Sequence, residues 1–308
     1  MSFRIRKMLA ASVAGAAFAA AAGAAQAEDI KIGIILGFTG PLESITPGMG
    51  GSAELAMKEV SDSGLLLDGA TLSSVRADST CIDAAAATAA AERLITSDNV
   101  AAIMGADCSG VTIAIANNVA VPNGVVMVSP SATSPALTDI DDKDYFYRTA
   151  PSDARQGEVL TEVLKSYDIK SVAVSYTNND YGKGFSDSFV AAFEAAGGKV
   201  TINAPHDDGK GDYSAEVGAL ASAGGDVLVV LGYVDQGGVG IIRAAVDTGA
   251  FDRFALGDGM YGQSLIDAIG DDLEKTVGVI PGAEGEGSTK FAEIAKAAGL
   301  DPSSSYTG

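Results

Sequence analysis

The stretches VAAIMGADCSG (residues 100–110) and VVMVSPSATSP (residues 125–135) decide the fold of this chain. Each opens with an apolar run, Val100–Met104 or Val125–Val128, that predicts a buried strand. Small hydroxyl residues lie within a few positions of the end of each run, so they lie at the carboxyl end of a strand. In open parallel sheets, ligands bind at that end of the strands. Hydroxyls and free backbone N–H groups at a helix start suit a carboxylate.

Outward from these stretches, short β-branched runs alternate with alanine-rich helical stretches in both halves of the chain. The order strand, helix, strand predicts parallel sheets with right-handed crossovers. Asp83 is the predicted N-cap of the helix that follows it. The predicted strands are 30–36, 72–77, 100–104, 125–128, 171–176, 200–202, 227–231, 254–256 and 276–280, and the predicted helices are 51–60, 84–95, 111–119, 182–195, 214–221, 237–248 and 263–269.

The segment Tyr145–Pro151 interrupts the alternation, and we interpret it as the crossover into a second lobe. We therefore predict one lobe over residues 28–149 and a second over residues 150–279. Residues 280–308 are expected to return to the first lobe, led back by the strand at 276–280. The sequence stops before the first lobe would be closed, so we expect it to be truncated.

Residues 1–27 have the features of a secretory signal peptide. A basic start precedes an alanine-rich apolar run, and Ala25–Ala27 forms an A-x-A cleavage site. A transmembrane anchor is the alternative, but alanine and glycine are weakly hydrophobic and small residues end the run. We expect an exported chain that begins at Glu28 and keeps 281 residues, which suits two α/β lobes.

Acidic residues outnumber basic ones by 40 to 20, which gives a net charge of −20. The leader removes three positive charges, so the exported chain is near −23. Such a surface repels nucleic acid and anionic membranes, and neither is expected as a partner. No run after the leader is long and apolar enough to span a bilayer. The charge indicates solubility and does not identify a ligand.

Cys81 and Cys108 are the two cysteines of the chain. An even count in an exported protein favours a disulfide, with two buried free thiols as the alternative. A zinc site would need more ligands, and His206 is the single histidine.

Catalytic motifs are missing from the sequence. One histidine, in a polar loop, argues against a Ser-His-Asp mechanism, and there is no G-x-S-x-G elbow, Walker A motif or dinucleotide fingerprint. The loop His206–Asp212 could suggest a metal site, but it lacks the EF-hand spacing and the terminal glutamate. We interpret it as a solvated turn. The sequence therefore predicts no enzyme, no metal site and no cofactor.

Ordered short motifs run through the whole of residues 28–308, and together they resemble one known family. They are Glu28–Gly33, Gly40–Pro41, Asp78, Cys81, Cys108–Ser109, Ser129–Thr138, Arg148–Thr149, Asp180–Gly182, Gly232–Tyr233 and Gly257–Gly259. Their order and spacing resemble the periplasmic leucine/isoleucine/valine-binding protein family, the type I binding proteins of ABC importers. The resemblance implies an α/β fold of the periplasmic binding protein-like I class, with two Rossmann-like lobes of parallel sheet joined by hinge strands.

The resemblance also implies roles for single residues. Ser109 and Thr133 would receive the α-carboxylate of a ligand through hydroxyls and backbone N–H groups, which are charge-assisted bonds. The Ser131 carbonyl, the Thr133 hydroxyl and the Asp258 carboxylate would hold the α-ammonium. Ala132, within the same loop, belongs to the implied ligand site.

Two tyrosines and the cysteines complete the implied site. Tyr181 and Tyr233 would lie on the second lobe and close over the ligand. The family's disulfide would match Cys81–Cys108 and would brace the strand end that carries Ser109.

Each of these residues also has an ordinary structural explanation. Ser109 or Thr133 alone is typical of a helix cap, Tyr181 of a packed surface aromatic, and Asp258 of a turn residue. Only the joint pattern favours binding.

The sequence departs from the family at two positions. The side-chain pocket usually has an aromatic residue after Gly-Pro, where this chain offers Ile45. The residue before the second cysteine is usually apolar, and here it is Asp107. A carboxylate there would pair with a polar or cationic ligand end, or it would point away and cap the Ser109 helix. Leucine-like specificity is therefore not expected to carry over unchanged.

The function that follows is capture of an amino acid, branched-chain or other, in the cleft between the lobes by hinge closure. The protein would act as a monomer in the periplasm and deliver the ligand to an ABC permease in the inner membrane. A ligand-sensing subunit for a membrane receptor is one alternative. A binder of an amide, urea or a small organic acid is another.

Overall fold

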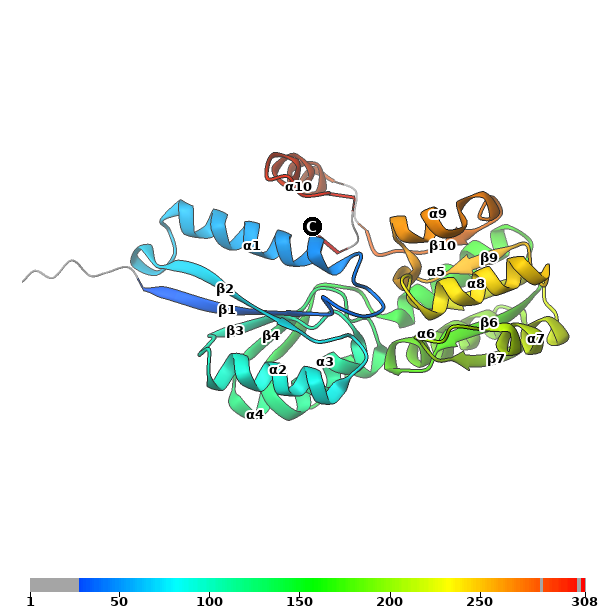
Figure 1. Ribbon diagram of the computed structural model, residues 1–308, viewed down its shortest axis with the longest axis horizontal. Helices are drawn as coiled ribbons and strands as arrows, with labels where there is room; N and C mark the ends of the chain where they lie inside the picture. The colour runs from blue at the N-terminus through cyan, green and yellow to red at the C-terminus, as the bar shows by residue number, and fades with distance from the viewer. Residues whose placement is uncertain (1–27, 283–284, 304–305, 308) are drawn as a thin grey trace, which may run out of the picture.

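Two α/β lobes lie side by side in the computed structural model, each around its own parallel sheet (Figure 1). The structure describes residues 28–282, 285–303 and 306–307, so the predicted signal peptide, 1–27, lies outside the described residues. Within these described ranges, no helix is both long and apolar enough to cross a membrane.

The first sheet has the strand order β2-β1-β3-β4-β5, with every neighbouring pair parallel. Its inner strand β1 ends in the fully buried run Ile34–Leu36. A strand buried on both faces needs cover on both, and α1 lies over one face while α2, α3 and α4 lie over the other (Figure 1). The elements are β1 Asp29–Leu36, α1 Thr46–Ser63, β2 Thr71–Asp78, α2 Ala84–Thr96, β3 Ala102–Gly105, α3 Ser109–Ile115, α4 Val121–Asn123, β4 Val126–Ser129 and β5 Phe146–Arg148.

The second sheet has the order β10-β9-β8-β6-β7, again parallel throughout. All five residues of its central strand β8 are buried. Its elements are α5 Asp153–Ser166, β6 Ser171–Thr177, α6 Asp180–Ala195, β7 Lys199–His206, α7 Ser214–Ala223, β8 Val227–Leu231, α8 Gly237–Thr248, β9 Phe254–Leu256, α9 Gln263–Ile269 and β10 Val277–Gly278, and α10 Glu286–Ala297 follows in the segment after this lobe.

An aromatic stripe anchors α6 in the second lobe. Phe185, Phe189 and Phe193 recur every four residues and are completely buried. Gly157 of α5 permits the close approach of α5 to α6, since a Cβ at that position would lie 2.8 Å from the Phe189 backbone nitrogen. Burial of aromatic side chains, and not helix propensity, holds α6 in the second lobe.

Every strand and helix predicted from the sequence overlaps an observed element, and the Asp83 side chain caps α2 as predicted. The structure adds detail at the crossover, and it shows that the strand predicted to lead back to the first lobe belongs to the second sheet. Part of the Tyr145–Pro151 crossover is β5, an edge strand of the first sheet. The strand predicted at 276–280 has only two residues and pairs with β9 of the second sheet. Further on, Leu300 lies against Gly51 of α1.

Helix α5 escaped prediction because its buried face is chemically mixed. That face includes the polar residues Gln156 and Thr161 as well as Gly157, beside Leu160 and Leu164. Buried polar groups interrupt the apolar 3.6-residue period on which helix prediction depends.

His206 does not lie in a polar loop, as the sequence predicted, because it ends β7 and is buried. Its Nδ1 is 2.8 Å from the Ser175 hydroxyl. Burial lowers the pKa of His206 to about 4, since a charged imidazole would lose its hydration there. The exposed part of this segment is the following turn, with Asp207 and Lys210 at the surface.

Burial of His206 predicts an acid-sensitive contribution to stability. Its folded-state pKa lies below the unfolded value, so stability is fully present above pH 6.5 and is lost as the pH falls toward 4. In His206→Gln this titration is absent. We expect the difference in unfolding free energy between wild type and variant to change by roughly 2–3 kcal/mol between pH 7 and about pH 4.5. Urea unfolding at both pH values measures it, and a pH-independent difference would contradict this account.

Candidate functional site

Two loops at the carboxyl ends of β3 and β4 are joined by serine side chains. The Ser131 hydroxyl donates to the Asp107 carbonyl at 3.0 Å, and the Ser134 N–H donates to Ser109 Oγ at 3.1 Å. Ser109 therefore accepts from the neighbouring loop and does not cap α3, and its own hydroxyl proton remains available to an acceptor. The loops identified from the sequence thus form one surface at the sheet edge, where parallel-sheet proteins bind ligands.

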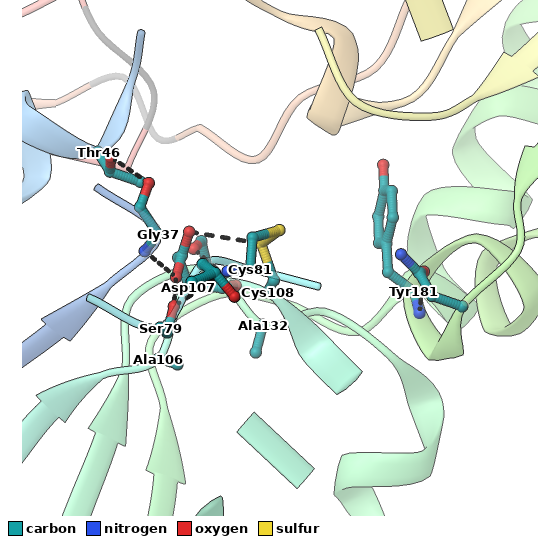
Figure 2. The surroundings of a disulfide bond; sticks show 12 residues. Gly37, Thr46, Ser79, Cys81, Ala106, Asp107, Cys108, Ala132 and Tyr181 are labelled. Atoms are coloured by element: carbon teal, nitrogen blue, oxygen red, sulfur yellow. Dashed lines mark hydrogen bonds between the residues drawn. A yellow bond between two sulfur atoms is a disulfide. The ribbon is translucent and has the colours of Figure 1, made fainter. Parts of the chain in front are cut away.

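The predicted disulfide between Cys81 and Cys108 is present, with an S–S distance of 2.01 Å (Figure 2). Beside it, Asp107 is buried, and its Oδ1 accepts from the Gly37 N–H at 2.9 Å and from the Ser79 hydroxyl at 3.2 Å. The disulfide and Asp107 together tie the ends of β1, β2 and β3. Burial raises the pKa of Asp107. The N-cap residue of α3 is Cys108, whose side chain makes no capping bond, and Asp107 accepts the backbone N–H of Cys108.

Asp258 is the buried carboxylate on the other side of the site. It follows β9, and its side chain accepts hydrogen bonds from two phenols, Tyr181 at 2.9 Å on Oδ1 and Tyr306 on Oδ2. The Tyr181 oxygen in turn accepts the Gly259 N–H at 3.1 Å. Burial raises the pKa of Asp258, and the two phenols partly offset that effect. Gln156 and the Gly259 N–H also lower the pKa of Asp258, so the carboxylate is hydrogen-bonded but has no cationic partner among the described residues.

Tyr181 and Tyr233 form an aromatic surface on the second lobe. Their rings stack with centroids 5.1 Å apart and planes at 16°. Both are almost fully buried, and burial raises the pKa of each phenol well above its usual range. The hydroxyls therefore stay protonated and serve as neutral donors.

These groups line one pocket between the lobes. Seven of the nine predicted ligand-binding residues line it. Its free volume is about 20 Å³, room for little more than one water molecule, so an amino acid can enter only if the walls move apart. The lining residues are Leu42, Ile45, Met49, Asp107, Cys108, Ser109, Ser131, Tyr181, Tyr233, Asp258, Gly259 and Tyr306.

Ala132 and Thr133 are fully buried and lie outside this lining. The Ala132 N–H donates to Ser129 Oγ at 3.0 Å, and the Thr133 carbonyl accepts the Asp153 N–H at 2.9 Å. The Thr133 side chain lies near the Asp153 carboxylate, whose pKa it lowers. Their part in ligand binding stays a prediction.

The structure adds pocket residues that the sequence did not single out. Leu42 and Met49 extend the apolar wall around Ile45, and Tyr306 arrives from the segment after α10. An apolar residue in a Gly-Pro loop carries no signal of its own. Tyr306 is 48 residues from the Asp258 carboxylate that it contacts, and only the tertiary fold brings them together.

A second buried carboxylate, Asp153, begins α5 close to Asp258. Gln156 donates to it at 2.8 Å. Burial raises the pKa of Asp153 well above its usual range, and the charge of Asp258 raises it further. The half-buried Arg148 guanidinium opposes this effect and also donates to the Ser134 carbonyl at 2.8 Å.

Asp235 of the second lobe forms hydrogen bonds that join the two lobes. Its Oδ2 accepts the Ser44 N–H of the first lobe at 2.9 Å, and its own N–H donates to the Pro41 carbonyl at 3.2 Å. Ser264 of its own lobe donates to Oδ1 at 2.8 Å. With these bonds made, the structure is a closed form.

Comparison with known proteins agrees with this geometry. Residues 29–308 match the family model described as periplasmic binding protein. A Leu/Ile/Val-binding protein of Rhizobium johnstonii is 32% identical over 269 residues, which cover 87% of this chain and 70% of that relative. The chain belongs to the leucine/isoleucine/valine-binding family of periplasmic binding proteins. The family resemblance inferred from the motifs is therefore confirmed.

Solved structures of this family share the fold. A leucine-binding protein of Thermotoga maritima superposes with a TM-score of 0.80 at 27% identity, over 90% of this chain and 78% of its own. The branched-chain amino acid transporter substrate-binding protein of Streptococcus pneumoniae, in complex with isoleucine, gives a TM-score of 0.78 at 25% identity, over 91% of this chain and 80% of its own. The predicted two-lobe, parallel-sheet class is confirmed.

The disulfide closes a loop of 27 residues, which predicts a measurable gain in stability. We expect reduction to lower the free energy of unfolding by roughly 3 kcal/mol, because the unfolded chain regains the entropy of the open loop. Urea unfolding with and without reductant measures this effect. The Cys81→Ala/Cys108→Ala double variant is the control and should not respond to reductant. Equal stability of oxidised and reduced wild type would contradict the expectation.

Proposed function

We propose that this family member captures a free amino acid in the pocket between its lobes and delivers it to an ABC permease of the inner membrane. The observation that carries the proposal is the pairing of chemistries in one pocket. A buried carboxylate, Asp258, lies on the second-lobe side, and hydroxyl groups at strand ends lie on the first-lobe side. The two sets match the ammonium and the carboxylate of an α-amino acid.

Ser109 is the proposed carboxylate donor on the first lobe. Its Oγ accepts from Ser134, which leaves the hydroxyl proton free to point at a ligand oxygen. The Thr133 hydroxyl, two residues beyond Ser131, is proposed to turn from Asp153 to the ligand once the lobes open and reclose. Bonds of this type to a charged group are the stronger class.

Asp258 is the proposed ammonium partner. Tyr181 and Tyr306 donate to its two oxygens and so fix the carboxylate plane. An ammonium would supply the missing counter-charge and so neutralise a charge that burial makes unfavourable. Lobe closure over the ligand then follows the hinge mechanism of two-lobe binding proteins. The proposal includes export to the periplasm and action as a monomer.

The direct test is a thermal-shift screen of the twenty amino acids beside amides, urea and small organic acids, followed by calorimetry. The proposal predicts that at least one amino acid raises the melting temperature and binds with one-to-one stoichiometry. A response limited to organic acids, or to amides and urea, would replace the amino acid with one of those ligand classes.

Removal of the Asp258 charge should abolish tight binding. Asp258→Asn leaves the ligand ammonium desolvated without a counter-charge, which should weaken binding of the cognate amino acid by about 2–5 kcal/mol. Tyr306→Phe is the matched control, because it deletes one phenol donor and keeps the charge, and it should cost less. Calorimetry on both variants measures the affinities. Unchanged affinity in Asp258→Asn would remove this residue from the site.

Asp235 should stabilise the closed form without contact with the ligand. Asp235→Ala removes side-chain bonds to both lobes, and each exposed bond of this kind contributes about 0.5–1.5 kcal/mol. We expect faster ligand dissociation with little change in the association rate, as measured by stopped-flow fluorescence. Asp267→Ala, which removes an exposed carboxylate bonded only to Gln263 of its own helix, is the control. Equal dissociation rates in the two variants would contradict a role in closure.

A further inference from the structure

The pocket contains a second carboxylate that the recognition of an ordinary amino acid leaves unused. Asp107 and Asp258 are 2% and 4% exposed, and both line the same cavity. None of the described residues that line this cavity is basic. The half-buried Arg148 is not among the lining residues. Its guanidinium donates to the Ala132 and Ser134 carbonyls.

An amino acid with a neutral side chain would satisfy only one of these two carboxylates. Its α-ammonium would meet Asp258 and its α-carboxylate would meet the strand-end hydroxyls, so it would bring no net charge. Closure around such a ligand would leave Asp107 desolvated and without a counter-charge. A buried carboxylate in that position is strongly unfavourable unless it is paired.

Asp107 is hydrogen-bonded but has no cationic partner among the described residues. Its Oδ1 receives the Gly37 N–H and the Ser79 hydroxyl, and the backbone N–H groups of Asp107 and Cys108 also stabilise the carboxylate. Its Oδ2 lies 3.4 Å from Cys108 Sγ, and sulfur in a disulfide has no proton to donate. Figure 2 shows the carboxylate beside the disulfide, on the side of the site opposite Tyr181.

The wall of the pocket near Asp107 is apolar. Leu42, Ile45 and Met49 are at most 7% exposed and line the same cavity. Aliphatic stems pack well on such a wall while a charged head reaches a polar group, as lysine side chains do at protein surfaces.

We infer that the ligand is an amino acid whose aliphatic side chain ends in an ammonium group, and that Asp107 receives that group. The inference rests on the proposed function, because it requires the ligand's α-groups to occupy Ser109 and Asp258. Asp107 then acts as the residue that selects cationic over branched-chain ligands, and the apolar wall contacts the methylene groups between the two charged ends.

Lysine and norleucine form the decisive ligand pair, because norleucine has a similar aliphatic side chain without the terminal ammonium. In wild type, lysine should bind at least about 10-fold more tightly than norleucine, as expected for a charge-assisted bond. In Asp107→Asn, the ratio of the two affinities should fall by about 10-fold or more. Asp252→Asn makes the same change of charge at the exposed surface and should leave the ratio unchanged. Calorimetry gives each affinity.

The outcomes separate this inference from the proposed function. Wild type that binds norleucine or leucine as tightly as lysine overturns the inference and leaves the proposed function intact. Wild type that binds no amino acid overturns both. If Asp107→Asn weakens both ligands equally, Asp107 only braces the loops and the inference fails. The wild-type ratio decides the matter even if the variant does not fold.

Discussion

The structure depends on a carboxylate that is buried where two lobes meet. Asp258 has lost its hydration, and the phenols of Tyr181 and Tyr306 replace only part of what water provided. Such a group favours any state in which a cation approaches it. Ligand capture and lobe closure are, in this account, the same event, because the cation that satisfies Asp258 must be enclosed by both lobes.

The first lobe supplies the rigid half of the site. The Cys81–Cys108 disulfide and the Asp107 bonds fasten three strand ends, and serine bonds fasten the neighbouring loop. A firmly held loop loses little entropy when it meets a ligand, and this pre-organisation favours affinity. The second lobe contributes the aromatic surface and Asp258, together with the Asp235 contacts that hold the closed form.

Much of the site could be predicted because it follows strand ends. Ser109 and Ser131 come a few residues after apolar runs, and the predicted parallel alternation of strands and helices places both at one sheet edge. Asp258 and Tyr181 could be named only through the family resemblance, since an isolated Gly-Asp-Gly or a single tyrosine is ordinary in any turn or helix. Asp107 differs from the residue usual in the family, and the sequence alone shows this. Its bonds to Gly37 and Ser79 could not be predicted, because they depend on the packing of three strands.

Other features lay beyond the sequence for physical reasons. Tyr306 contacts Asp258 because the fold brings together two segments that are 48 residues apart in the sequence. Asp153 and Gln156 are polar residues on a buried helix face, where local pattern predicts the opposite. His206 is also a buried polar residue where the sequence predicts exposure. A histidine beside two aspartates is typical of a surface turn, but His206 ends β7 and lies in the interior. Burial of polar groups is a property of the assembled fold and leaves no local signature.

The central claim is that one ligand must present both an ammonium and a carboxylate to close the lobes. Calorimetry with the tightest-binding amino acid, its deaminated acid and its decarboxylated amine tests it most directly. The account predicts that each analogue loses at least about 30-fold in affinity, because each leaves one side of the pocket with an unmatched polar group. A deaminated acid that binds as tightly as the amino acid would contradict the role of Asp258 and with it the account.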